Sequence, residues 1–142
     1  MHLVSPSPSV ALVSNFNDLV TTRYQGTVNA LCWERDLIGD FKEIVNCLTL
    51  QDHVTEVSAE DLSVLNLSLQ GDLARQIILQ DLQQLTQIGA APVLNLIQCY
   101  ARDDELDFIA TDVYSYHVDR SPIATDTFLC TYHGAASDIL PN

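Results

Sequence analysis

Residues 71–88 read GDLARQIILQDLQQLTQI and carry the longest helical pattern of the chain. Apolar side chains recur along it at helical spacing, at Leu73, Ile77, Leu82, Leu85 and Ile88. Glutamines fill the side that we expect to face water, and Gly89 followed by Pro92 ends the pattern. We therefore expect one long helix here, with its apolar stripe turned toward a core.

Two shorter helices and a strand are predicted before this helix. Apolar residues from Leu37 to Leu48 fall at helical spacing, and Asp36 is placed to cap the start of that helix. Ser58 is the expected N-cap of the next helix, because acidic residues follow it in the first turn. Earlier in the chain, residues 27–33 contain residue types that are typical of a strand.

The C-terminal third is predicted to form strands. Residues 92–100 contain a run of apolar side chains that fits a buried strand. Residues 107–119 and 125–133 are placed to pair as a hairpin across the turn at Pro122. Because the chain runs from a strand through helices to further strands, we expect an α+β fold, with helices packed on one face of a mainly antiparallel sheet.

A single domain spanning residues 1–142 is expected, because 142 residues fit the usual domain size and 47% of them are hydrophobic. Ser and Pro alternate over residues 5–9, so we expect residues 1–14 to form a flexible N-terminal arm. The apolar run that follows is too short for a signal peptide, and no stretch approaches the ~20 apolar residues of a membrane span. These features predict a cytoplasmic location.

The charge balance is strongly acidic, with 19 Asp and Glu against 6 Lys and Arg, and a net charge of −13. Such a surface repels phosphate backbones and anionic bilayers, so neither nucleic acid nor a membrane is expected as a partner. It favours cationic partners, either a basic protein or a divalent metal ion.

One segment near the C-terminus contains candidate metal ligands. If residues 112–119 form a strand, the side chains of His117 and Asp119 point to the same face. An imidazole and a carboxylate at this spacing can hold one divalent ion, zinc or iron, and His133 is the third candidate ligand. The residues expected to line the same site are Tyr116, Cys130 and Tyr132. In the structural alternative, Asp119 caps a loop and His117 is hydrogen-bonded within a sheet.

The catalytic residues, if there are any, are left unknown by the sequence. The chain has no G-x-S-x-G motif, no G-x-G-x-x-G motif and no Walker A phosphate loop. Acid–base chemistry through Asp112, His117 and Asp119 stays open, as does a Cys130 nucleophile paired with His117.

The four cysteines have mainly apolar neighbours and form no C-x-x-C motif. We therefore expect Cys32, Cys47, Cys99 and Cys130 to be free thiols in the core rather than members of a disulfide framework. His53, which follows the polar residues 51–52, is expected on the surface as a residue without a special role.

A family resemblance is carried by two C-terminal motifs, Tyr116-His117-Val118-Asp119 and Leu129-Cys130-Thr131-Tyr132-x-Gly134. They resemble motifs of an uncharacterised bacterial family catalogued as domain of unknown function 1826. Residues 28–35 are similar to the opening strand of that family. The family has no established activity, and its genomic association with a zinc-homeostasis neighbour implies a link to metal ions. The resemblance also implies a C-terminally shortened member.

The function predicted from these observations is binding of a metal ion or a small ligand through the strand that holds His117 and Asp119. The alternative is a non-enzymatic acidic interaction module that binds a basic protein partner.

Overall fold

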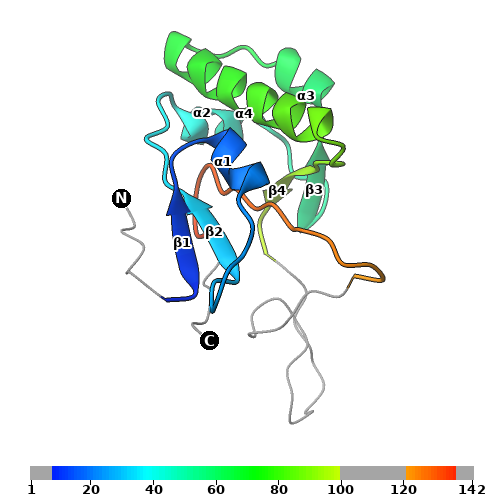
Figure 1. Ribbon diagram of the computed structural model, residues 1–142. Coiled ribbons are helices and arrows are strands. Elements are labelled where there is room, and N and C mark those ends of the chain that lie inside the picture. The colour runs from blue at the N-terminus through cyan, green and yellow to red at the C-terminus, as the bar shows by residue number, and fades with distance from the viewer. Residues whose placement is uncertain (1–7, 100–120, 137–142) are drawn as a thin grey trace. The chain divides into compact units, whose positions relative to one another are not determined.

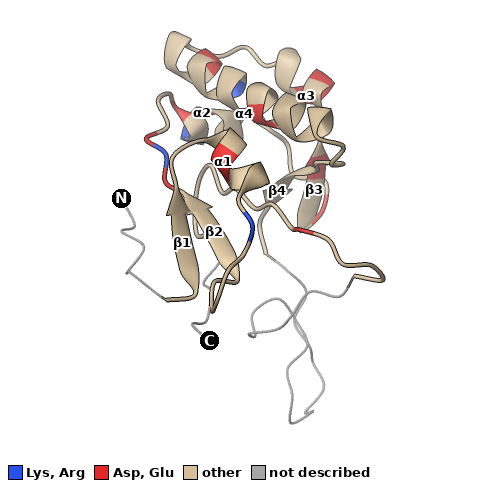
Figure 2. Cartoon of the chain, in the orientation of Figure 1, with Lys and Arg blue, Asp and Glu red and all other residues tan. Residues whose placement is uncertain are grey.

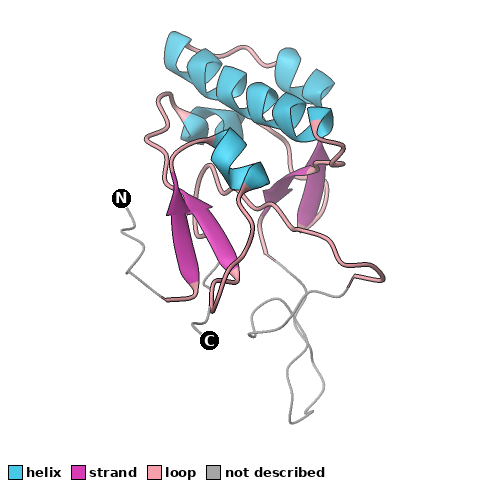
Figure 3. Cartoon of the chain, in the orientation of Figure 1, coloured by secondary structure: helices cyan, strands magenta, loops and turns pink. Residues whose placement is uncertain are grey.

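The computed structural model describes residues 8–99 and 121–136 (Figure 1). Its elements are β1 (Val10–Val13), α1 (Phe16–Thr21), β2 (Ala30–Trp33), α2 (Phe41–Cys47), β3 (Val54–Val57), α3 (Ala59–Ser63), α4 (Leu69–Gln87) and β4 (Leu94–Ile97). The mixture of helices and strands confirms the α+β class. The described strands form two separate pairs, of which β1–β2 is parallel and β3–β4 antiparallel (Figure 3).

The chain divides into two compact units, whose described parts are residues 8–36 and residues 37–99 with 121–136. The first unit is built on the parallel pair, in which Val10 pairs with Ala30, and α1 lies in the connection that parallel strands require. The Ser9 carbonyl accepts a hydrogen bond from the Ala30 amide at 3.2 Å. The predicted flexible arm over residues 1–14 is therefore wrong for residues 10–13, because their backbone is paired with β2.

The second unit has a small core at the junction of its helices and its strand pair. The buried apolar side chains of this core are Phe41, Ile44, Val57, Leu62, Ala74 and Ile78. Helix α4 packs on α2 and α3 (Figure 1). The loop that precedes α2 lies against the α4 backbone at Gly39. Gly39 has φ +111°, and a Cβ there would lie 2.6 Å from the Ala74 nitrogen, so the position requires glycine.

Two sequence predictions for these helices need correction. Helix α2 begins at Phe41 and is capped by Asp40, whose side chain accepts from the Glu43 amide, rather than by Asp36. Helix α4 buries Ala74 and Ile78 most deeply, whereas Ile77 and Leu82 of the predicted stripe are partly buried and pack against this core. Because the Ala74 side chain is small, α2 can pack close to α4 at this position. A search for large apolar residues at helical spacing misses such a position.

The antiparallel pair β3–β4 alternates between a more buried and an exposed face, as expected for a half-buried strand pair. Thr55 and Val57 of β3 are buried, whereas Val54 and Glu56 are exposed. The predicted strand over residues 92–100 is confirmed as β4, which pairs with β3 in antiparallel register.

Residues 121–136 contain no strand, so the expected strand over residues 125–133 is wrong. Tyr132 instead holds this segment on the helices of the same unit. Its ring stacks on Phe41 with 5.5 Å between centroids, and its hydroxyl donates to an Asp81 carboxylate oxygen at 2.8 Å. The stacking and the hydrogen bond fasten the segment without backbone pairing. The predicted partner strand, residues 107–119, lies outside the described residues.

Within residues 8–99 and 121–136, no helix is both long enough and apolar enough to cross a membrane.

Candidate thiol–imidazole site

Two strands of the second unit bring an imidazole and a thiol together at the end of the β3–β4 pair where Val54 lies opposite Ile97. His53 immediately precedes β3, and Cys99 follows β4 by one residue beyond Gln98. The Gln98 amide donates to the His53 carbonyl at 2.8 Å, which continues the ladder past its last strand pair. The Cys99 Sγ then lies 3.3 Å from the His53 Nδ1. We call these two side chains the thiol–imidazole pair.

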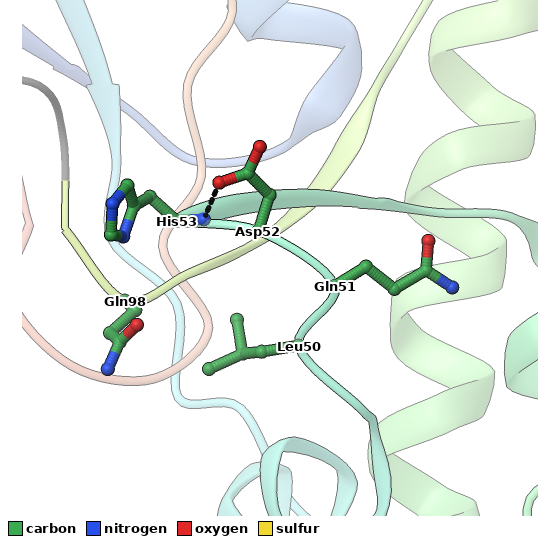
Figure 4. A pocket seen from close by; sticks show the side chains of 5 residues that line it. All are labelled: Leu50, Gln51, Asp52, His53 and Gln98. Carbon is green, nitrogen blue, oxygen red and sulfur yellow. Dashed lines mark hydrogen bonds between the residues drawn. The ribbon is translucent and has the colours of Figure 1, made fainter.

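Buried Thr55 holds the loop that carries His53. Its hydroxyl oxygen accepts hydrogen bonds from the backbone amides of Gln51 at 3.0 Å and Asp52 at 3.2 Å. The Asp52 carboxylate in turn accepts from the His53 amide at 2.7 Å (Figure 4). Because three successive amides are satisfied by fixed side-chain oxygens, the loop has a defined geometry before any ligand binds.

An open depression of about 200 Å³ lies beside the imidazole. The residues that line it are Leu50, Gln51, Asp52, His53 and Gln98. Figure 4 shows the His53 ring and the Gln98 amide on one side of the depression, with Leu50 near them and the Gln51 side chain extending away. The His53 residue is exposed and Cys99 is partly exposed, and His53 alone of the two lines the depression.

The geometry of the thiol–imidazole pair fits two kinds of chemistry. A distance of 3.3 Å allows a hydrogen bond between the Cys99 thiol and a His53 ring whose proton is on Nε2. It also fits a shared metal ion, because Zn–S and Zn–N bonds at a tetrahedral angle place sulfur and nitrogen about 3.6 Å apart. The observed separation is shorter by only a few tenths of an ångström.

Only part of the sequence-predicted site lies within the described residues, so that site stays a prediction. His117, Asp119 and Tyr116, together with Asp112, lie outside the described residues. His133 is exposed, on a segment without regular structure. Among the residues that the structure describes, no three His, Cys, Asp or Glu side chains are grouped so that they could hold a metal ion.

Tyr132 and Cys130, which were expected to line a site, belong to the anchor of residues 121–136. Burial, the neighbouring Cys130 thiol and the hydrogen bond to Asp81 raise the pKa of Tyr132. The phenol therefore stays protonated and donates to the Asp81 carboxylate, which explains Tyr132 as a structural contact.

The cysteines are less buried than predicted. All four are free thiols, as expected, but Cys47 and Cys130 are exposed and Cys32 and Cys99 only partly buried. Burial and the charge of Glu34 raise the pKa of the Cys32 thiol. None of the four cysteines belongs to the cluster of buried core residues.

Many carboxylates of the second unit serve as hydrogen-bond acceptors at helix starts. Asp40 caps α2, and Glu43 accepts from the Ser68 amide at 2.7 Å at the start of α4. Asp61 forms a capping box with Ser58, and the hydrogen bonds from Ser58 lower the pKa of Asp61. Negative charge at these positions is favoured by the helix dipole. Acidic residues outnumber basic ones along the described ribbon (Figure 2).

We found no match to this chain among family models, curated proteins or solved structures. The resemblance to domain of unknown function 1826 stays a prediction that rests on its two motifs.

Proposed function

We propose that this protein binds a thiophilic divalent metal ion, with zinc as the first candidate, and that Cys99 and His53 supply two of its ligands. The observation that carries the proposal is the 3.3 Å approach of the Cys99 Sγ to the His53 Nδ1. These two donor atoms come from positions 46 residues apart in the sequence, and neither residue is buried.

The donor types favour zinc or iron over calcium or magnesium. A thiolate with an imidazole is a borderline-soft donor set, whereas magnesium and calcium prefer oxygen. Two protein ligands leave coordination positions for water or a small ligand, and the depression beside His53 has room for one. The hydrogen bonds of Thr55 already hold the loop that carries His53, so metal binding loses less conformational entropy in ordering that loop.

The test is a titration of the apoprotein with Zn²⁺ by calorimetry, and with Co²⁺, whose absorption reports thiolate coordination. We expect about one equivalent of metal with a thiolate-to-cobalt charge-transfer band. Cys99→Ser and His53→Gln should each weaken binding at least about ten-fold. The matched control is Cys47→Ser, which changes an exposed thiol elsewhere in the unit. Unchanged binding in both site variants would refute the proposal.

His117, Asp119 and His133 stay metal-ligand candidates from the sequence alone. The same titration with His117→Ala tests them separately. Loss of metal in His117→Ala and His133→Gln, with Cys99→Ser unaffected, would support the sequence-predicted site in place of the thiol–imidazole pair.

The alternative proposal is an acidic module that binds a basic protein partner. It is favoured by the net charge of −13. Two of the described cations are already engaged within the chain: Arg75 pairs with Asp72 and donates to the Leu62 and Leu65 carbonyls, and the Arg35 guanidinium carbon lies 4.4 Å from the Trp33 ring centroid. Capture of a basic peptide that weakens steeply between low and physiological salt would support this alternative. Equal capture of a neutral peptide would count against it.

A further inference from the structure

We propose that the outer edge of β3 binds an extended basic segment of a partner protein, which adds to the β3–β4 pair as a further antiparallel strand. The backbone groups of Val54 and Glu56 form this edge. The inference rests on the alternative function given above, the acidic module, and assigns that module a binding surface and a class of ligand. It does not depend on metal binding.

The register of the strand pair directs the backbone of Val54 and Glu56 outward. In an antiparallel pair, opposite residues alternate between positions that exchange two hydrogen bonds and positions that exchange none. The Gln98 amide donates to the His53 carbonyl at 2.8 Å, so these two residues occupy a hydrogen-bonded position. The next pair, Val54 with Ile97, is then non-hydrogen-bonded, and Glu56 occupies the following position of that kind. The N–H and C=O groups of Val54 and Glu56 therefore point away from β4.

This edge is open in the part of the chain that the structure describes. The sheet has two strands, so β3 has a neighbouring strand on one side only. Among the described residues, the outward backbone groups of Val54 and Glu56 have no hydrogen-bond partner, and neither has the Glu56 carboxylate. Sheet edges are commonly protected by proline, by lysine or by a bulge. The strand β3 contains neither residue type and pairs with β4 in continuous register, so a further strand can pair with it.

The charges around β3 select a basic occupant. Residues 43–74 contain no Lys or Arg, whereas Asp52 precedes β3, Glu56 lies within it and Glu60 follows it. Residues 90–98, which include β4, contain no charged side chain, so a basic segment is attracted more strongly to the β3 edge than to the β4 edge. A second copy of this chain is disfavoured as the occupant, because it would bring another net charge of −13 to the same edge.

The alternation along β3 specifies the side-chain pattern of the segment. Val54 and Glu56 lie on the same face of the strand, and Val54 is 39% exposed. In a strand added beside β3, the side chains opposite these two residues lie on that face as well. An apolar side chain opposite Val54 covers it, and a Lys or Arg opposite Glu56 pairs with the carboxylate. We therefore expect a segment in which basic and apolar residues alternate two positions apart.

The experiment measures, by fluorescence anisotropy at low salt, how the full chain binds the labelled, capped peptide Thr-Lys-Thr-Val-Thr-Lys-Thr. In an antiparallel strand, the Val and Lys amides face β3 and the inner Thr amides face away. N-methylation of the Val amide and one Lys amide should weaken binding at least about ten-fold, whereas N-methylation of the two inner Thr amides should have little effect. Both methylated peptides carry the same charge. Equal affinities, or a larger loss for the Thr-methylated peptide, would overturn the inference.

Variants of the protein test which edge binds the peptide. Val54→Pro removes an outward N–H group without removing a hydrogen bond to β4, and it should weaken binding at least about ten-fold. Ile97→Pro makes the same change at the opposite residue on the β4 edge and should bind like the wild type. Glu56→Gln keeps the edge and should weaken binding about two-fold to five-fold at low salt. Circular dichroism checks the fold of each variant, and equal losses in the two folded proline variants would overturn the assignment to β3.

The outcomes also separate this inference from the function on which it rests. Salt-sensitive binding that is equal for both methylated peptides and unchanged in Val54→Pro would keep the acidic module and overturn the β3 edge. Binding of a polylysine peptide without binding of the alternating peptide would have the same meaning. Failure of both peptides to bind at low salt would overturn the edge and the acidic module together.

Discussion

Removal of a single hydroxyl group, in Tyr132→Phe, tests whether Tyr132 is a structural anchor rather than a site residue. The substitution keeps the ring that stacks on Phe41 and removes the hydrogen bond to Asp81. A hydrogen bond to a charged group contributes about 1.5–3 kcal/mol, and partial exposure of the Tyr132 side chain favours the lower end. We expect a loss of about 1.5 kcal/mol in the free energy of unfolding at pH 7.

Urea denaturation followed by far-ultraviolet circular dichroism measures this loss, since helices α2, α3 and α4 belong to the same unit as Tyr132. With the usual dependence on urea, 1.5 kcal/mol moves the midpoint by about 0.5–1.5 M. Tyr24→Phe is the control, because it removes the hydroxyl of an exposed tyrosine in the other unit and should have little effect.

The pH dependence gives a second readout of the same contact. Because the folded state raises the pKa of Tyr132, its contribution to stability is fully present below the unfolded pKa of about 10 and is lost as pH rises above that value. The difference in stability between wild type and Tyr132→Phe should therefore shrink above about pH 10. A variant as stable as wild type at pH 7, or a difference that stays constant up to high pH, would refute the anchor.

Three further substitutions test the fold and the preorganised loop. Gly39→Ala should cost at least about 2 kcal/mol in denaturation experiments, because it adds a Cβ against the Ala74 backbone at φ +111°, and a wild-type midpoint would contradict this packing. The backbone amide and the hydroxyl of Ser58 both lower the pKa of Asp61, and Ser58→Ala removes only the hydroxyl bond. The part of the wild-type advantage that this bond supplies is present above the ordinary Asp pKa and should disappear as pH falls below it; parallel acid titrations of both proteins would contradict this. Thr55→Val should leave the fold intact by circular dichroism yet weaken Zn²⁺ binding about ten-fold, and equal affinity would show that the loop needs no support.

Local patterns predicted several elements well. The helix over residues 71–88, the Ser58 cap and the strand within residues 92–100 follow from periodicity and capping chemistry, which act over a few neighbouring residues. The predictions that failed depend on distant partners. Residues 10–13 form a strand because β2 pairs with them, and residues 125–133 form none because Tyr132 attaches the segment by its side chain.

The candidate site shows the same division. Sequence alone identified the acidic charge, the free thiols and the mixture of helices and strands, because composition and local spacing determine these properties. It assigned His53 and Cys99 to unrelated places, since no local pattern links residues 46 positions apart. The antiparallel register of β3 and β4 brings them together, and register is a property of long-range pairing between strands. Tertiary structure therefore supplied the one cysteine–histidine contact on which the proposed chemistry depends.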